Sequence, residues 1–474
     1  MDKEIDKTLN RKTDFKYPPI DAKRQARLLR FSPGKVSWVV NYHLEVVLLA
    51  DLSCTNYKAL SYTWGHASIV DIPEIQIDDQ PFFIRRNLFE FLATAAARSE
   101  YGSFFIDAIC INQLDDCERQ SQVQEMARIY RNANQVIAWL GLPDPEQLDH
   151  IQALSQKTRG TSCRDCSTWT NSQWAGFKYL SYHNFWRRIW IVQEVLLASS
   201  MVVWCGAFTF PLALFGSTPS TLPSLQTKIA ANGRPSNVIS AVSRLRSPAE
   251  TIVTHRLRQA PLPRRERDPL AQGTKIGTIG EMMTGLRSAS EVMATYQSQV
   301  PDLLYQVVRK FGRLDCSDPR DRLYGLLGIL NERSREKIEP DYRRDVRYAC
   351  YQALKIGLQE LSFEKRSVVF PDHFEDTDHT YLAYYCDVRD AFSIEDGVSL
   401  SILRQVLNEL QFPARLQDAI FEVQWQPQLV WRNAEVKIDP IFKQLVMQTA
   451  QENLEAEGLL FKFHTGQHRV IEGL

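Results

Sequence analysis

The segment "SFFIDAICINQLDDCERQSQVQEMARIYRNANQVIAWLG" (residues 103–141) decides the fold class, because two strand patterns flank one helical pattern in it. Residues 103–111 are apolar except for Asp107, which is typical of a buried strand. Residues 135–141, "QVIAWLG", have the same character. A strand, a helix and a second strand in so short a span predict a parallel crossover and therefore an α/β fold.

The helix in this segment has a recognisable start. Asp115 can cap it, and Glu118 stands three residues later in the register of a capping box. Apolar side chains then recur at the spacing of one helix face, at Val123, Met126, Ala127 and Tyr130. For Glu118 we therefore expect a capping role.

Short apolar runs extend the same architecture over residues 36–210. Strands are predicted by "HLEVVLLADL" (43–52), "YKALSYTWG" (57–65) and the hairpin "EIQIDDQPFFI" (74–84). The hairpin turn is expected at Asp78-Asp79, and Asn87 is placed to cap the helix that follows. We expect a parallel sheet flanked by helices.

A chain of 474 residues is too long for one ordinary core, so several units are expected. The predicted units are an N-terminal extension (1–35), the α/β domain (36–210), a variable, partly disordered basic insert (211–300) and a mainly helical C-terminal region (301–474). Between Lys228 and Asp268 there are nine Lys or Arg against three acidic residues. A flexible solvated insert is favoured here over a basic interaction arm.

Helices are predicted in the C-terminal region at 316–330, 345–361, 399–411 and 440–458. In the first of them, "CSDPRDRLYGLLGIL", Ser317 is expected to be the cap and Pro319 to lie in the first turn.

Composition narrows the class of function. Acidic and basic residues number 56 each, so net charge gives no reason to expect a nucleic acid or a membrane surface as partner. The N-terminus is charged and unlike a signal peptide, and no apolar run approaches the roughly 20 residues that span a bilayer. We therefore expect a cytoplasmic protein.

The sequence contains few signs of metal or cofactor chemistry. Nine cysteines at irregular spacing fit reduced thiols, and the single C-x-x-C, at Cys163 and Cys166, has no second ligand pair. The chain has no Gly-rich phosphate loop, no G-x-S-x-G and no H-E-x-x-H. No metal or cofactor is expected, and any catalysis should depend on carboxylates.

Two clusters follow predicted strands. In "YKALSYTWG" a strand ends in Tyr62, Trp64 and Gly65, at the sheet edge where α/β proteins bind ligands. The alternative is a strand with core aromatics, which residue types alone favour.

The second cluster is "IDAICINQ", in which Asp107 interrupts a buried strand and Asn112 and Gln113 follow it. A buried carboxylate must be paired, hydrogen-bonded or close to water. Asp107 is thus either a cleft residue or a structural acceptor for nearby loop N–H groups.

A third cluster lies in "FWRRIWIVQEVLLA" (185–198). If this run is one helix, Arg187 and Trp190 share a face with Glu194. A guanidinium, an indole and a carboxylate would then converge. The alternative is a structural Arg–Glu pair on a partly buried helix, with Trp186 and Trp190 in the core.

These clusters, in this order, resemble the fungal heterokaryon incompatibility (HET) domain. The resemblance rests on residues 57–65, 104–141 and 185–198, and "DPRDRLYGLLGI" (318–329) and "IEPDY" (338–342) resemble segments that often follow that domain. It implies a cytoplasmic fungal protein of non-self recognition and regulated cell death. HET domains are distantly similar to TIR domains, which are flavodoxin-like, and some of these cleave NAD.

The TIR catalytic glutamate lies in a pattern like W-C-x-x-E-L, and "WIVQEV" presents Trp190 and Glu194 at that spacing. Some positions depart from the HET pattern: Phe105 stands where the family usually has Trp, and the aromatic pair Phe185-Trp186 is inverted. Arg188 matches the family arginine, whereas Arg187 is the one aligned with Glu194 on a helix. The sequence therefore leaves open which of the two arginines belongs to the site.

The leading hypothesis is a TIR-like domain that hydrolyses NAD as substrate, with Glu194 stabilising the oxocarbenium-like state. Trp190 would wall the pocket, and Tyr62, Trp64 and Gly65 would surround the nucleotide. Asp107, Asn112 and Gln113 would line the floor or order that loop.

The alternative is a non-catalytic module that signals death by self-association or through an upstream sensor protein. Glu194 would then belong to a structural ion pair.

Overall fold

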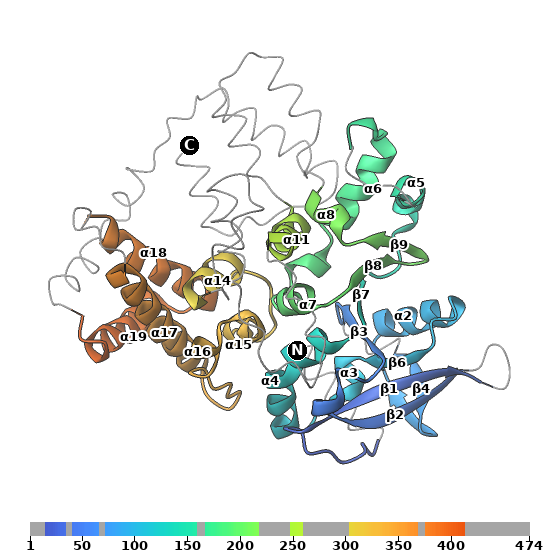
Figure 1. The fold of residues 1–474 in the computed structure, drawn as a ribbon, viewed down its shortest axis with the longest axis horizontal. Helices are drawn as coiled ribbons and strands as arrows, with labels where there is room; N and C mark the ends of the chain where they lie inside the picture. The colour runs from blue at the N-terminus through green and yellow to red at the C-terminus, as the bar shows by residue number, and fades with distance from the viewer. Residues whose placement is uncertain are drawn as a thin grey trace, which may run out of the picture. The chain divides into compact units, whose positions relative to one another are not determined.

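The computed structural model describes residues 15–34, 40–65, 72–158, 166–217, 247–258, 303–367 and 375–412. Its nine strands form one sheet (Figure 1). The strands are β1 (Gln25–Pro33), β2 (Val40–Leu48), β3 (Tyr57–Tyr62), β4 (Glu74–Ile77), β5 (Gln80–Phe83), β6 (Gly102–Phe105), β7 (Gln135–Trp139), β8 (Met201–Cys205) and β9 (Phe208–Pro211).

The helices divide between the sheet and the C-terminal region. Those of the first half are α2 (Arg86–Ala97), α3 (Asp107–Cys110), α4 (Asp116–Asn132), α5 (Leu148–Thr158), α6 (Asn171–Ser181), α7 (Ile191–Leu197), α8 (Ala213–Ser217) and α11 (Pro248–Arg258). Those of the second half are α14 (Leu304–Phe311), α15 (Asp321–Tyr324), α16 (Glu332–Arg335), α17 (Val346–Ser367), α18 (Glu375–Phe392) and α19 (Asp396–Glu409). Short 3-10 turns include η4 (Asn184–Arg187) and η5 (Leu327–Ile329).

The strand order is β5-β4-β2-β1-β6-β3-β7-β8-β9. Its centre, β6-β3-β7-β8, is parallel, which confirms the α/β class and the crossover at 103–141. The prediction of a parallel sheet is wrong at the edges, because β1 pairs antiparallel with β2 and β6, β4 with β5, and β8 with β9. Two-residue turns join β4 to β5 and β8 to β9, and in the first of them Asp78 and Asp79 both have positive φ, as a tight hairpin turn requires.

Strand β1 lies within residues 1–35, so the predicted domain boundary at residue 36 is too late. The strand was missed because Arg27 interrupts its apolar pattern. Arg27 is nevertheless buried, and its guanidinium donates to both carboxylate oxygens of Glu118, at 2.7 and 3.0 Å. Breaking one partner of such a pair typically costs about 3–5 kcal/mol.

Helix α4 follows its prediction except at Glu118. Asp115 caps it by accepting from the N–H groups of Cys117 and Glu118. The Glu118 side chain does not close a capping box and instead pairs with Arg27 and accepts from the N–H of Asn112. Asn87 also differs from its prediction, because its side-chain amide binds the Thr63 carbonyl instead of capping α2.

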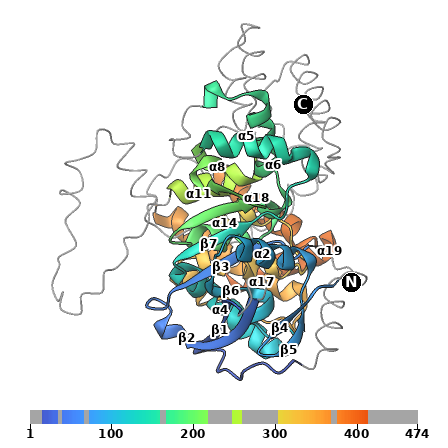
Figure 2. The ribbon, with the colours of Figure 1, turned by 90° about the vertical axis from the view of Figure 1, so that its right-hand side faces the viewer.

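Helices cover both faces of the sheet. In Figure 1, α4 and α7 lie on the left of β3 and β7 and α2 on the right, and in Figure 2 α2 lies in front of the sheet. Buried tyrosines join the α4 layer to β3: Tyr130 donates to the Leu60 carbonyl at 2.8 Å, and Tyr57 donates to the Ile129 carbonyl at 2.5 Å.

The described part of the C-terminal region is helical, as predicted. Helices α17 and α19 correspond to the predicted runs at 345–361 and 399–411, whereas 440–458 lies outside the described residues. The single helix predicted at 316–330 is wrong. Arg320 is the N-cap of the short α15, and the chain continues into η5 after Gly325.

The chain divides into two compact units, one of Met1–Ser367 with Tyr384–Val406 and one of Val368–Ala383 with Leu407–Leu474. In the second unit the ring of Tyr381 packs edge-on against Phe412. The sheet and all features discussed below belong to the first unit.

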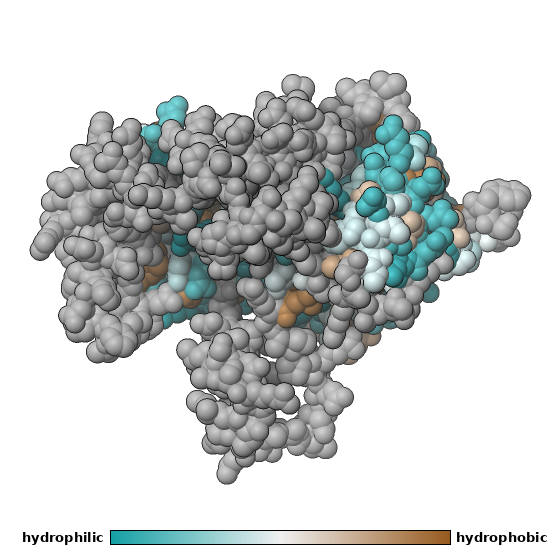
Figure 3. Space-filling model, turned by 90° about the horizontal axis from the view of Figure 1, so that it is seen from above, coloured by the Kyte–Doolittle hydropathy of each residue, from teal (hydrophilic) through white to brown (hydrophobic). Residues whose placement is uncertain are grey.

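Among the described residues, none of the helices combines the length and the apolar character that a membrane crossing requires. On the face drawn in Figure 3, most of the described surface is hydrophilic, with small hydrophobic areas.

Two glycines bring the segment that contains α15 and η5 against the sheet domain. A Cβ on Gly328 would stand 2.6 Å from the Ala127 Cβ and 2.6 Å from the Gln193 side-chain oxygen, and one on Gly325 would stand 3.2 Å from Ile189. These contacts place η5 directly on α4 and α7. The segment therefore packs as part of the domain core.

We predict that Gly328→Ala lowers the free energy of unfolding by about 1–3 kcal/mol, because overpacking forces the helices apart. Gly397→Ala is the matched control, since a Cβ there meets nothing within 4 Å. Chemical denaturation of both variants checks this, and equal stabilities would contradict close packing at Gly328.

Candidate functional site

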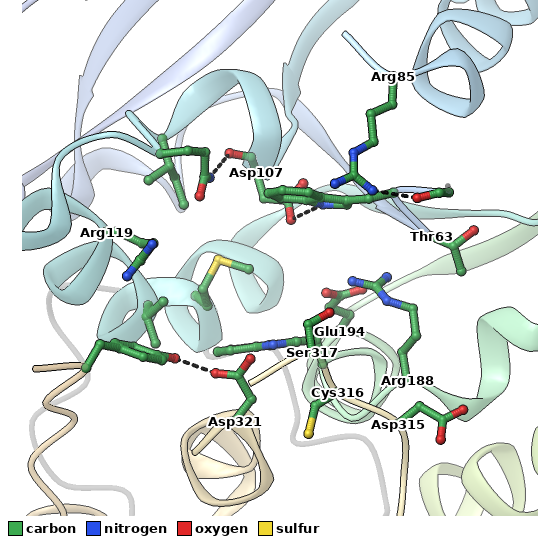
Figure 4. A pocket seen from close by; sticks show the side chains of 18 residues that line it. Thr63, Arg85, Asp107, Arg119, Arg188, Glu194, Asp315, Cys316, Ser317 and Asp321 are labelled. Atoms are coloured by element: carbon green, nitrogen blue, oxygen red, sulfur yellow. Dashed lines mark hydrogen bonds between the residues drawn. The ribbon is translucent and has the colours of Figure 1, made fainter. Parts of the chain in front are cut away.

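A pocket of about 450 Å³ opens at the carboxyl ends of β3 and β6 (Figure 4). Helices α4 and α7 form its walls together with residues of the 315–342 segment. Of the ten residues predicted for the site, seven line this pocket: Trp64, Gly65, Asp107, Gln113, Arg188, Trp190 and Glu194. Tyr62, Asn112 and Arg187 are not among its lining residues.

The loop after β3 forms one wall. Gly65 has φ +78°, a left-handed conformation that glycine adopts without strain. The Arg85 guanidinium donates to the Gly65 carbonyl and lies 5.4 Å from the centre of the Trp64 ring. This stacking holds the Trp64 indole beside Asp107, to whose carboxylate it donates at 3.0 Å.

Asp107 does not lie in a strand as the sequence predicted, because β6 ends at Phe105 and the short α3 begins at Asp107. Its carboxylate accepts from the N–H of Ala108 at 2.8 Å and also from the side chains of Trp64 and Tyr62. Burial raises the pKa of Asp107, and the charge of Arg188 opposes this. Asp107 therefore both orders the loop and faces the pocket.

Asn112 and Gln113, the polar residues that follow α3, have different positions relative to the pocket. The Gln113 side chain donates to the Asp107 carbonyl at 2.9 Å and lines the pocket. Asn112 accepts from the N–H of Leu114 at 3.1 Å, which makes it a residue of the loop turn. Tyr62 is buried, and its carbonyl accepts from Arg188.

The helix predicted at 185–198 is interrupted. Turn η4 ends at Arg187, Arg188 is extended, and α7 begins at Ile191. The reason is tertiary: the Ile189 N–H donates to the Asp315 carbonyl at 3.0 Å, and the Asp315 N–H donates to the Arg187 carbonyl at 2.6 Å. The break turns Arg188, not Arg187, into the pocket, so the predicted alignment of Arg187 with Glu194 is wrong.

Glu194 is 3% exposed and lies on the pocket wall. Burial raises its pKa to about 7, against the attraction of Arg188 and a hydrogen bond from the Ser61 hydroxyl. The nearby Asp107 carboxylate raises the pKa further. The sequence did not indicate Ser61, because a hydroxyl inside an apolar strand is not by itself a functional pattern.

The sequence also missed the residues that close the pocket from beyond the sheet. Arg119 of α4, Asp321 of α15 and Tyr342 all line it. Of these three, Asp321 and Tyr342 lie in the segments 318–329 and 338–342, which the family resemblance includes, but the resemblance gave them no role in a site. Spacing cannot show such a contact, because these segments are far from 57–194 along the chain.

Within the described ranges, there is no group of three or more His, Cys, Asp or Glu residues that could hold a metal ion. Cys163 lies outside those ranges. The pocket lining itself offers carboxylates, arginines, indoles, hydroxyls and one thiol.

We predict that Glu194→Gln stabilises the fold at about pH 8. Burial raises the pKa of Glu194 from 4.5 to about 7, so this group's contribution to stability is complete below pH 4.5 and is lost as pH rises toward 7. Each pKa unit is worth about 1.4 kcal/mol, so removing the charge should add about 3–4 kcal/mol at high pH and nothing near pH 4.5. Denaturation at both pH values checks this, and a loss of stability at about pH 8 would indicate a structural ion pair.

The part of the chain that is similar to known proteins includes all seven of the predicted residues that line the pocket. Residues 57–194, from the start of β3 to Glu194, match the family described as heterokaryon incompatibility protein (HET). Over 97 residues the chain is 35% identical to "Heterokaryon incompatibility protein 6, OR allele" of Neurospora crassa. That alignment covers 18% of this chain and 14% of the relative, so it spans a small part of both.

No solved structure matches the chain. The match over 57–194 and the resemblance of the sequence clusters that form the pocket lead to one assignment: residues 57–194 of the chain form a HET domain.

Proposed function

We propose that this HET-domain protein acts in fungal non-self recognition and regulated cell death, and that it does so by hydrolysing NAD in the cytoplasm. The observation that carries the proposal is Glu194, a buried carboxylate on the wall of a pocket of about 450 Å³. The name of the Neurospora relative supports the biological role.

The order of the parallel strands supports a TIR-like, flavodoxin-like relationship. In chain order these strands are β3, β6, β7 and β8, and in the sheet they stand as β6-β3-β7-β8. Numbered along the chain this is 2-1-3-4, the start of the flavodoxin-like order. Such sheets bind nucleotides at the carboxyl ends of their strands, where this pocket opens.

The lining suits a nucleotide. Trp64 and Trp190 provide flat apolar surfaces for a base or a nicotinamide ring, and Arg85 and Arg188 can attract phosphates. A volume of about 450 Å³ lies within the usual range for ligand sites, about 300–1,000 Å³.

In the proposed reaction the bond between the ribose C1′ and the nicotinamide nitrogen breaks, and neutral nicotinamide leaves with the bonding electrons. The ionised Glu194 stabilises the cationic sugar and then accepts a proton from the water that attacks C1′. The products are ADP-ribose, nicotinamide and one proton. Nicotinamide is a good leaving group because it is positively charged in NAD, so no strong general acid is needed.

We predict that purified protein consumes NAD and that Glu194→Gln reduces kcat at least about a hundredfold, since electrostatic groups of this kind contribute that much. Glu125→Gln is the matched control. Burial also raises the pKa of Glu125, but this side chain does not line the pocket. Release of nicotinamide, measured by chromatography, checks both variants.

Equal turnover by wild type and Glu194→Gln would reject the enzymatic proposal. The alternative, a signalling or assembly module, is favoured by Val46 and Leu48 on β2, which are 38% and 48% exposed. Killing by Glu194→Gln on expression in a fungal host would support that alternative, through self-association or a sensor partner.

The pH profile should follow Glu194, because only its ionised form stabilises the cation. With the pKa of Glu194 raised to about 7, kcat/KM should rise with pH up to about 7 and level off above it. Initial rates of NAD consumption between about pH 5 and pH 9 check this, and a profile that is flat from pH 5 to 7 would exclude Glu194 as the group that must ionise.

A further inference from the structure

The pocket is completed by residues outside the matched range 57–194. Asp315, Cys316, Ser317, Asp321 and Tyr342 contribute two carboxylates, two hydroxyls and a thiol to its lining. None of these five is basic. This wall therefore suits a part of the ligand that carries hydroxyl groups and no negative charge.

The wall is firmly attached to the domain. The backbone of Asp315 pairs with Arg187 and Ile189, and Gly325 and Gly328 allow close packing against the sheet domain. Farther along, the Arg320 guanidinium donates to the Tyr342 carbonyl and to both carboxylate oxygens of Asp318. The positions of Asp321 and Tyr342 are thus set by the protein before any ligand binds.

The Asp321 carboxylate of this wall is buried and fixed by a hydrogen bond. It is 7% exposed, and its carboxylate accepts from the Tyr342 hydroxyl at 2.6 Å. The guanidinium carbons of Arg119 and Arg320 each lie 5.3 Å from the centre of the Tyr342 ring. The Arg119 charge is compensated by Asp116, at 3.0 Å.

We propose that Asp321 binds the ribose hydroxyls of the adenosine half of the dinucleotide and makes the pocket select NAD over NADP. In the view of Figure 4, Asp321 and Arg119 lie to the left of Glu194, beside which the proposed function places the nicotinamide ribose. A carboxylate accepts hydrogen bonds from ribose hydroxyls and repels a 2′-phosphate. This inference rests on the proposed function and adds a specificity residue to it.

The test measures binding without turnover. ADP-ribose and ADP-ribose 2′-phosphate, which have no nicotinamide to lose, are titrated into the full-length protein by calorimetry. We expect wild type to bind ADP-ribose at least about tenfold more tightly than its 2′-phosphate. In Asp321→Asn this ratio should fall about tenfold, because the carboxylate charge that distinguishes the two ligands is gone.

Asp345→Asn is the matched control, because Asp345 lies in the same part of the chain, is exposed and does not line the pocket. Its ratio should equal that of wild type. Equal weakening of both ligands in Asp321→Asn would overturn the proposal in favour of a structural role, and so would failure of wild type to bind either ligand. A ratio that depends on Asp321 in a protein that does not cleave NAD would uphold the inference and reject the proposed reaction.

Discussion

Burial of the Glu194 carboxylate is the constraint on which the site depends. A charge removed from water needs compensation, and here it comes from the Ser61 hydroxyl on β3 and the attraction of Arg188. Compensation is incomplete, since the pKa of Glu194 remains raised to about 7. A carboxylate kept at that cost beside a pocket is characteristic of functional sites.

The same constraint explains the local backbone around the site. Arg188 lines the pocket with the carboxylates because the chain is extended there instead of helical, and it is extended because Asp315 supplies the backbone partners. Asp107 is compensated in the same way, by Trp64, Tyr62 and the N–H of Ala108. The pocket is therefore a set of mutually compensating polar groups drawn from distant parts of the chain.

Beyond the pocket, the structure uses a buried ion pair to attach β1. Arg27 and Glu118 satisfy each other, and Glu118 also accepts from the N–H of Asn112, so one carboxylate joins β1 to the loop before α4. The segment around Gly328 packs on α4 and α7 in turn. The HET domain thus depends on residues before and after the matched range.

The sequence by itself determined the α/β class, the crossover at 103–141, the hairpin turn at Asp78-Asp79 and the family. Each of these depends on local periodicity or on contiguous motifs, that is, on residues close together in the chain. It also indicated Trp64, Asp107, Trp190 and Glu194, which line the pocket. Only the tertiary structure decided that Arg188 replaces Arg187, that Glu118 pairs with Arg27, and that Asp321 and Tyr342 close the pocket. These are long-range pairings of polar groups whose partners are set by packing, and spacing along a chain carries no record of them.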